Sequence, residues 1–412
     1  MRGRFAFLVS VFIAVLSIVA SGSAAVTKVK RVSVSSSGTA ADQGSITSAI
    51  SADGRYVAFA STADNLVHGD TNTTYDVFVH DLKTGRTKRA SVASSGAEAH
   101  GLSDHPSISA DGRIVVFNSD APDLVNGDNN ATTDIFVHNM KTGKTRRVSM
   151  SSSGAEADNY SGNASISENG RFVAFQSTAD NLVPGDTNTQ QDVFVRDLKN
   201  GKTRRVSVSS AGTEGDGSSS APSISADGRL VAFSSQATTL VPNDGNATGD
   251  IFVNDRKTHR TRRVSVSSSG AEADGFSYNF PSLSANGRFV AFASHATNLV
   301  GHDLNGKTDI FLRDLDKKTT KLISVSSSGE QANDDSFLVD PLVVSNDGGE
   351  VAFISLATNL LAGGTTGEQV FLRDVKKHKT RLLNVSGSGV QGDGNSFDPS
   401  MTPDGRSISF SS

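Results

Sequence analysis

Five loops of the sequence carry acidic and amide side chains in the same order. Each loop reads Asp-x-Asn-x-x-x-Asp and leads into an apolar segment, as in GDTNTTYDVFVHDL from Gly69. Ca²⁺ takes about six to eight oxygen ligands, and alternate loop positions can direct carboxylate and amide oxygens at one ion. The pattern therefore predicts weak calcium sites, with these candidate ligands: Asp70, Asn72, Asp76, Asp128, Asn130, Asp134, Asp186, Asn188, Asp192, Asp244, Asn246, Asp250, Asp303, Asn305 and Asp309.

The same side chains have a second interpretation, in which they cap the turns of their own loop. An EF-hand loop needs glycine at position six, and only Gly249 among the five loops provides it. Position twelve, Asp81 in the first loop, lies five residues along an extended segment from Asp76. That is roughly 16 Å at the rise of a strand, too far to reach the same ion. Calcium is therefore the one cofactor in question, and both interpretations stay open.

These loops recur because a whole unit recurs. A tight ADGR-like turn has its Asp or Asn at positions 53, 111, 169, 227, 286, 347 and 404, at intervals of 58, 58, 58, 59, 61 and 57 residues. A period this regular indicates one supersecondary unit copied along the chain. The sixth unit, AGGTTGEQVF from Ala362, has lost the acidic pattern.

Each unit is predicted to contain four antiparallel strands. In the first unit these are residues 45–51, 56–61, 76–82 and 87–94, because apolar residues alternate there and turn residues separate the segments. Four-stranded antiparallel units that repeat are typical of a β-propeller, in which each unit is one blade. We call the strands of a blade a, b, c and d. The fold class is therefore all-β, with residues 26–412 as one propeller domain of repeats of about 58 residues.

Phenylalanine supports this arrangement. Phe59 in strand b and Phe78 in strand c recur at the same positions in later units, where we expect them to fill the space between neighbouring blades. Counting strands favours seven blades, the last closed by a strand at residues 28–36 from the N-terminus. That blade has no evident strand c, so it has three strands or the reading frame is truncated. A six-bladed ring with an appended hairpin is the alternative.

Residues 1–25 have the pattern of a secretory signal peptide. Arg2 and Arg4 precede an apolar run from Phe5 to Ala20, and small residues allow cleavage before Val26. No second apolar segment could span a bilayer, which predicts a protein that is secreted, periplasmic or at the cell surface. The sequence contains no cysteine, so disulfides and thiol chemistry are excluded.

Charge argues against nucleic acid as a partner. The formal net charge is −4, and loss of Arg2 and Arg4 would take it to −6. Phosphate binding needs a clustered basic surface. Lys and Arg do recur in strand d, as in TKRA and TRRV. Basic residues on an outer strand discourage pairing between sheet edges, and binding of an anionic cell-wall polymer is the alternative.

The unit resembles the TolB-type, WD-like β-propeller repeats of exported bacterial proteins. That family has a Ser-Pro-Asp-Gly-Lys/Arg turn followed by an apolar strand ending in Phe. TPDGRSISF, residues 402–410, matches best, and SADGRYVAF, residues 51–59, replaces Pro with Ala. The resemblance covers residues 27–412 and implies a propeller and an exported location. The chain has no Trp and lacks the N-terminal α/β domain of TolB, so the resemblance does not imply a role in the Tol system.

The leading hypothesis for function is a monomeric, non-enzymatic binding or scaffold protein of the cell envelope. Long b–c and d–a loops would form one rim of the ring and bind an envelope or extracellular protein or glycan. The alternative is a glycan hydrolase or lyase with its site at the mouth of the central channel. No catalytic residue is assigned. An enzyme would need a blade that breaks the repeat, and Asp334, Asp335 and Asp340 lie in the divergent units.

Overall fold

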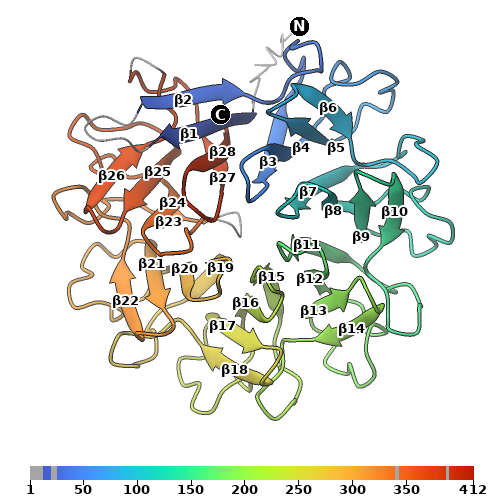
Figure 1. Ribbon diagram of the computed structural model, residues 1–412. Coiled ribbons are helices and arrows are strands. Elements are labelled where there is room, and N and C mark those ends of the chain that lie inside the picture. Colours follow the sequence, from blue (N-terminus) through green and yellow to red (C-terminus); the bar gives the residue numbers. More distant parts are fainter. Residues whose placement is uncertain (1–12, 20–25, 339–342, 387–388) are drawn as a thin grey trace, which may run out of the picture.

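The fold is a ring of seven antiparallel sheets (Figure 1). The computed structural model describes residues 13–19, 26–338, 343–386 and 389–412. Each sheet has four strands, which confirms the all-β propeller with seven blades and excludes the six-bladed alternative. Within those ranges there is no helix with the length and apolar character that crossing a membrane requires.

Blades 1 to 3 follow one another along the chain as simple meanders. Blade 1 contains β3 (Ser45–Ile50), β4 (Tyr56–Ser61), β5 (Asp76–Asp81) and β6 (Arg86–Arg89). Blade 2 contains β7 (Ser103–Ile108), β8 (Ile114–Ser119), β9 (Asp134–Asn139) and β10 (Lys144–Arg147). Blade 3 contains β11 (Ser161–Ile166), β12 (Phe172–Ser177), β13 (Asp192–Asp197) and β14 (Lys202–Arg205).

Blades 4 to 6 repeat the same order. Blade 4 contains β15 (Ser219–Ile224), β16 (Leu230–Ser235), β17 (Asp250–Asp255) and β18 (Arg260–Arg263). Blade 5 contains β19 (Ser277–Leu283), β20 (Phe289–Ser294), β21 (Asp309–Asp314) and β22 (Thr319–Leu322). Blade 6 contains β23 (Ser336–Phe337), β24 (Glu350–Ser355), β25 (Gln369–Asp374) and β26 (Lys379–Leu382).

Blade 7 joins the two ends of the chain. Its strands are β27 (Phe397–Met401), β28 (Ser407–Ser411), β1 (Ile13–Val19) and β2 (Val26–Arg31), in the order β2-β1-β28-β27. Figure 1 shows β1 beside β28. The expectation that this blade lacks strand c is wrong, because β1 pairs with both β28 and β2. Closure by an N-terminal strand is confirmed, with that strand at Val26–Arg31 rather than 28–36.

β1 lies inside the segment predicted to be a signal peptide. Ile13 and Ala14 are fully buried, and each belongs to an apolar cluster that contains residues of a neighbouring blade. Cleavage before Val26 stays a prediction, and it would separate β1 from the rest of blade 7.

Turn chemistry explains why strands a and b pair in register. In blade 1 the Asp53 carboxylate accepts hydrogen bonds from Ser51 Oγ (2.6 Å) and from the Arg55 amide (3.0 Å). Gly54 adopts a φ of 68°, which a residue with a side chain rarely takes. The predicted segments for strands a to c are confirmed. Strand d is shorter than predicted, because after Arg89 the chain turns into a small bridge between Val92 and Glu98.

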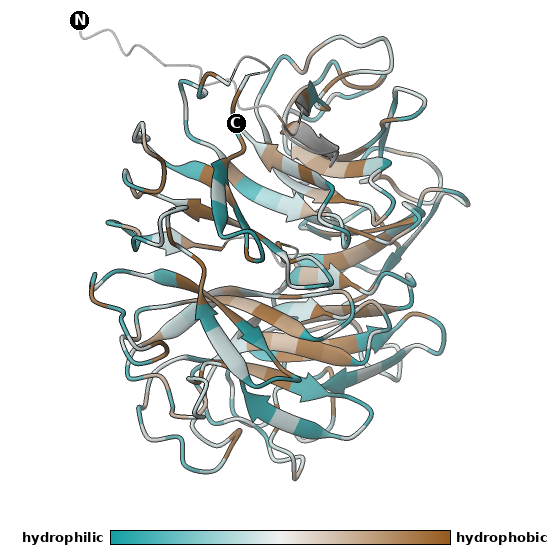
Figure 2. Cartoon of the chain, turned by 60° about the vertical axis from the view of Figure 1, so that its left-hand side comes forward, coloured by the Kyte–Doolittle hydropathy of each residue, from teal (hydrophilic) through white to brown (hydrophobic). Residues whose placement is uncertain are grey.

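The core lies between blades. Phe59 and Phe78 pair across β4 and β5 with ring centroids 5.8 Å apart, and neither has exposed surface. Phe117 and Phe136 of blade 2 form one cluster with apolar side chains of blade 1, including Val77. This confirms the predicted role of the repeated phenylalanines. Figure 2 shows the apolar segments concentrated in the strands and the polar ones in the loops.

A polar contact joins each blade to the chain that enters it. Thr87 Oγ1 donates to the carbonyl of Val34 at 2.5 Å and contacts His80 Nδ1 at 2.9 Å. The same threonine-to-carbonyl bond recurs in the next five blades, at Thr145, Thr203, Thr261, Thr320 and Thr380. Burial lowers the pKa of His80 to about 4. This histidine is therefore a neutral structural partner at neutral pH.

We expect a chain that starts at Val26 to unfold at a lower temperature than the full chain, by more than about 5 °C, because blade 7 loses its third strand. Thermal unfolding followed by circular dichroism measures the difference. A chain that lacks only residues 1–11 is the control, since it keeps β1. Equal melting temperatures for all three chains would show that β1 does not stabilise the ring.

Candidate functional site

The two rims of the ring differ in their loops. The a–b and c–d turns are short and lie on one rim, whereas the b–c and d–a loops lie on the other, which we call the long-loop rim. All three exposed large apolar side chains among the described residues belong to the long-loop rim: Phe276, Leu304 and Val390. Loops held by a rigid scaffold are where binding residues usually lie.

In blade 1 an arginine lies among the predicted calcium ligands. Arg89 Nη1 is 3.3 Å from Asp70 Oδ1 and 3.1 Å from Asp76 Oδ2, and it also contacts Glu98 Oε1. Its Nη2 donates to the carbonyl of Gly69 at 2.8 Å. The Arg89 side chain is only 8% exposed, so the guanidinium supplies positive charge where a metal ion was expected.

Three further blades repeat this arrangement, which we call the arginine cluster. In each case an arginine from the end of strand d contacts one aspartate of the b–c loop, the aspartate that begins strand c and one glutamate of the d–a loop. The groups are Arg147 with Asp128, Asp134 and Glu156; Arg205 with Asp186, Asp192 and Glu214; and Arg263 with Asp244, Asp250 and Glu272.

The loop asparagine has a structural role in the cluster. Asn72 Nδ2 donates to Asp76 Oδ2 (3.0 Å) and to the carbonyl of Ala99 (2.9 Å), while its Oδ1 accepts from the Thr74 amide (2.9 Å). Asn130, Asn188 and Asn246 make the corresponding contacts in their blades. The structure thus agrees with turn capping, and calcium binding stays a prediction that, in blades 1 to 4, requires the guanidinium to move.

Burial shifts the pKa values within the cluster. It raises the pKa of Asp70 to about 7, helped by the nearby charge of Asp76. Burial also raises the pKa of Asp186 to about 7, although Arg205 opposes the shift. Burial disfavours the charged form of Glu98 as well, but hydrogen bonds from Thr71 and Arg89 outweigh it and lower the pKa of Glu98 to about 2.

Blades 5 and 6 depart from the arginine cluster. In blade 5 Leu322 replaces the arginine and Gln331 replaces the glutamate, while Asp303, Asn305 and Asp309 remain. Burial raises the pKa of Asp309 to about 6 and also raises that of Asp303. In blade 6 the corresponding positions are all uncharged: Gln369, Leu382, Asn384 and Gln391.

The long-loop rim carries an aromatic stack at blade 5. The rings of Phe276 and Tyr278 are 4.6 Å apart, and those of Tyr278 and His295 are 5.8 Å apart. Phe276 is 37% exposed. Its ring lies against Gly249, where an added Cβ would approach it to 2.7 Å. A side chain at position 249 would therefore clash with the Phe276 ring, and this close contact, not an EF-hand turn, accounts for the glycine.

Neighbouring loops support this stack. His295 Nε2 lies 2.9 Å from Thr308 Oγ1, and the Thr308 amide donates to Asp335 Oδ1 at 2.8 Å. Lys307 Nζ pairs with Asp334 Oδ1 at 2.9 Å. Asp334 and Asp335 thus join the loops of blades 5 and 6, and Asp340 lies outside the described residues.

A second group of residues, most of them polar, lies on the strands that surround the axis of the ring (Figure 1). Thr47, His105, Asn163, Ala221 and Asp398 have φ between 42° and 53°, and each sits at a bulge in the pairing of strands a and b. Asp398 Oδ2 accepts from the Thr47 amide at 3.3 Å, and burial raises the pKa of Asp398 to about 6.

Sequence reasoning missed the arginine and glutamate of the cluster. It assigned the basic run of strand d to edge protection, and the structure divides that run. Arg86 and Lys88 are exposed, whereas Arg89 is buried in the cluster. The signal was present, because an arginine and a glutamate recur nine residues apart, as in Arg89 and Glu98, with the same period as the loop.

Comparison with known proteins shows the fold alone. No protein-family model matches the chain, and no curated protein matches its sequence. Putative TolB from Agrobacterium tumefaciens is 16% identical over 76% of this chain and 88% of its own, with a TM-score of 0.45. An oligogalacturonate lyase from Vibrio parahaemolyticus is 11% identical over 98% of this chain and 97% of its own, with a TM-score of 0.52. A prolyl endopeptidase is 13% identical over 86% of this chain but only 44% of its own, with a TM-score of 0.53.

We expect Arg89→Met to destabilise the chain by about 3–5 kcal/mol, because it leaves buried carboxylates without their cation. Millimolar calcium should then restore part of the lost stability, while leaving the unmodified chain unchanged. Urea unfolding with and without calcium measures both effects. Lys88→Met is the control, since Lys88 is exposed beside the cluster. Equal stabilisation of the unmodified chain by calcium would show that metal binds with the guanidinium in place.

The clusters also predict a pH dependence of stability. The pKa values of Asp70 and Asp186 are raised to about 7 in the folded chain. Between about pH 4 and about pH 7 these two carboxyls are therefore protonated in the folded chain but ionised in the unfolded chain. Protonation of the two carboxyls stabilises the folded chain, and this stabilisation is lost as pH rises from about 4 to about 7. The melting temperature of the unmodified chain should fall between about pH 5.5 and about pH 8. The melting temperature of the double variant Asp70→Asn, Asp186→Asn should fall less over the same range. Asp404→Asn, in an exposed turn, is the control. An unchanged pH profile in the double variant would contradict the assignment.

Proposed function

We propose that this chain is an exported, non-enzymatic binding protein of the cell envelope that binds a protein or a glycan through its long-loop rim. The observation that carries this proposal is the aromatic stack of Phe276, Tyr278 and His295 at blade 5. Aromatic side chains that are partly exposed on a rigid support are the usual anchors of binding surfaces.

Two further features support the rim as the binding surface. Leu304, 84% exposed, belongs to the b–c loop of the same blade as Tyr278 and His295. The arginine clusters of blades 1 to 4 fix their b–c loops to their d–a loops through buried ion pairs. Loops held in this way lose little conformational entropy when a partner binds.

The envelope location rests on the sequence. Arg2, Arg4 and the apolar run that follows have the pattern of an export signal. The absence of cysteine removes any dependence on the redox state of the compartment. The outer edge of each of blades 1 to 4 is a strand of only four residues that carries basic side chains, which discourages pairing with a second copy and supports a monomer.

The alternative is a glycan hydrolase or lyase with its site at the channel mouth. Asp398 is the observation that favours it, because a carboxyl whose pKa is raised to about 6 can donate a proton near neutral pH. His105 lies near enough to influence the charge of Asp398, and it pairs with Asp104 at 2.9 Å. These groups come from different blades and could converge on one bound sugar.

Binding of the recombinant chain to an envelope fraction tests the proposal. We expect Phe276→Ala and His295→Ala each to weaken binding by about tenfold, because each removes part of the stack. Val390→Ala is the control, since Val390 is exposed on a different loop of the same rim. Melting temperatures establish that the variants fold. Unchanged binding in both variants would contradict the blade 5 site, and release of shortened glycans that Asp398→Asn abolishes would favour the enzyme.

A further inference from the structure

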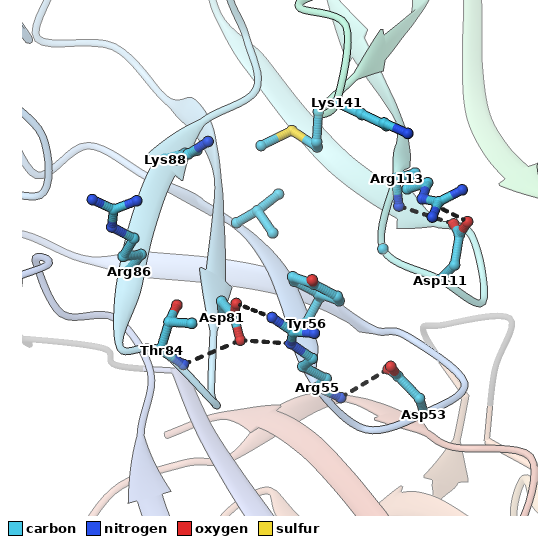
Figure 3. A pocket seen from close by; sticks show the side chains of 13 residues that line it. Asp53, Arg55, Tyr56, Asp81, Thr84, Arg86, Lys88, Asp111, Arg113 and Lys141 are labelled. Carbon is cyan, nitrogen blue, oxygen red and sulfur yellow. Dashed lines mark hydrogen bonds and ion pairs between the residues drawn. The ribbon is translucent and has the colours of Figure 1, made fainter.

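The opposite rim contains a pocket at the junction of blades 1 and 2 (Figure 3). Its volume is about 480 Å³, within the range of small-molecule sites. The short turns of both blades and strand β6 form its walls. The arginine clusters and the aromatic stack lie on the other rim, so this pocket is separate from the surface proposed above.

The acidic side chains of the pocket already have partners. Asp81 accepts two hydrogen bonds from the Arg55 guanidinium, at 2.9 and 2.7 Å, and further bonds from the amides of its own turn. Asp53 and Asp111 cap their a–b turns, and Asp111 also pairs with Arg113. These carboxylates are engaged within the chain.

Three cations of the pocket have no such partner. Arg86, Lys88 and Lys141 line it and are exposed, and no ion pair or side-chain hydrogen bond engages them within the described residues. Figure 3 shows Arg86 and Lys88 on one wall and Lys141 on the other. The pocket therefore presents uncompensated positive charge from two neighbouring blades.

The floor of the pocket is apolar. Tyr56 and Met140 pack against the cluster between blades 1 and 2, and Val79 of that cluster also lines the pocket. The Arg55 guanidinium lies over the Tyr56 ring at 4.7 Å, and the ring also rests on Gly112, where an added Cβ would approach it to 2.1 Å. The Tyr56 ring is thus held in place by contacts within the chain, and Met140 and Val79 supply further apolar surface of the floor.

The repeat provides internal comparisons for this pocket. At the junction of blades 3 and 4, Phe172 takes the place of Tyr56 and Arg256 takes the place of Met140. Arg256 lies over the Phe172 ring at 4.4 Å and donates to the carbonyl of Gly228. The chain therefore places its own cation on the aromatic ring at that junction.

The junction of blades 5 and 6 resembles that of blades 1 and 2, because no arginine follows strand c. Phe289 and Val375 replace Tyr56 and Met140, and the pocket there has a volume of about 660 Å³. Arg288 pairs with Asp314 as Arg55 pairs with Asp81. Lys317 and Lys321 line this second pocket without an ion pair among the described residues.

From this arrangement we infer that the two open junctions, of blades 1 and 2 and of blades 5 and 6, each bind an acidic sugar unit. The apolar floor fits the carbon–hydrogen face of a sugar ring, and the unpaired Arg and Lys side chains fit its carboxylate. Each pocket is expected to bind one chain of acidic sugars, independently of the other pocket.

Titration calorimetry with a tetramer of hexuronic acid tests this inference. We expect two sites per chain, with affinity that falls as salt increases. In the Met140→Arg variant the new arginine should fill the first pocket, as Arg256 does at the junction of blades 3 and 4. One binding site should then remain. Adding Val375→Arg should leave none. Lys88→Gln should weaken the first site by about tenfold, while Lys144→Gln, an exposed lysine of blade 2 outside the pocket, should not.

Three further probes decide the ligand class. The matched neutral hexose tetramer should not bind at these sites, and inorganic phosphate and AMP should bind much more weakly than the uronate. Equal binding of the neutral tetramer, or of phosphate or AMP, would overturn the assignment to an acidic sugar. If the Met140→Arg variant still bound the tetramer at two sites, the pocket between blades 1 and 2 would not be a binding site. Because the variants lie on the rim away from Phe276, these results are independent of envelope binding through the aromatic stack.

Discussion

A guanidinium buried among carboxylates is the interaction on which the long-loop rim depends. Arg89 brings together side chains from three parts of its repeat: Asp70 of the b–c loop, Asp76 at the start of β5 and Glu98 of the d–a loop. A buried charge is tolerated only when opposite charges and hydrogen bonds surround it. The arginine and the glutamate are therefore present or absent together, whereas blade 5 keeps Asp303 and Asp309 without them. Blade 6 has lost the arginine and every carboxylate of the cluster, whereas blade 5 has lost the arginine and the glutamate.

Much of the fold could be predicted from the sequence because its determinants are local and repeated. The Asp53–Gly54 turn, the alternation in 56–61 and the recurrence of Phe59 and Phe78 each depend on neighbours within one or two strands. Six or seven copies of each signal, at nearly constant spacing, leave little choice of architecture. Closure by the N-terminus followed from the same counting, because strand d precedes the first strand a.

The features that escaped prediction depend on contacts distant in the sequence or on a departure from the repeat. Arg89 lies 19 positions after Asp70 and contacts it only once strand d has paired with strand c. β1 shares no motif with the other third strands, because Ala14 stands where they have phenylalanine. Met140 lines a pocket between blades 1 and 2, whereas Arg256 covers the ring of Phe172 between blades 3 and 4, a difference that has meaning only when two blades are packed together.

The two rims therefore use the repeat in different ways. On the long-loop rim, charged side chains of four blades form internal ion pairs. The exposed aromatic stack lies at blade 5, the first blade without an arginine cluster. On the short-turn rim, the acidic side chains are satisfied by local arginines, and positive charge is left uncompensated where a junction stays open. In a ring of near-identical blades, a place where one blade differs from its neighbours can bind a ligand that the other blades do not. The departures at Leu322 and Met140 mark such places, and they lie on opposite rims of the ring.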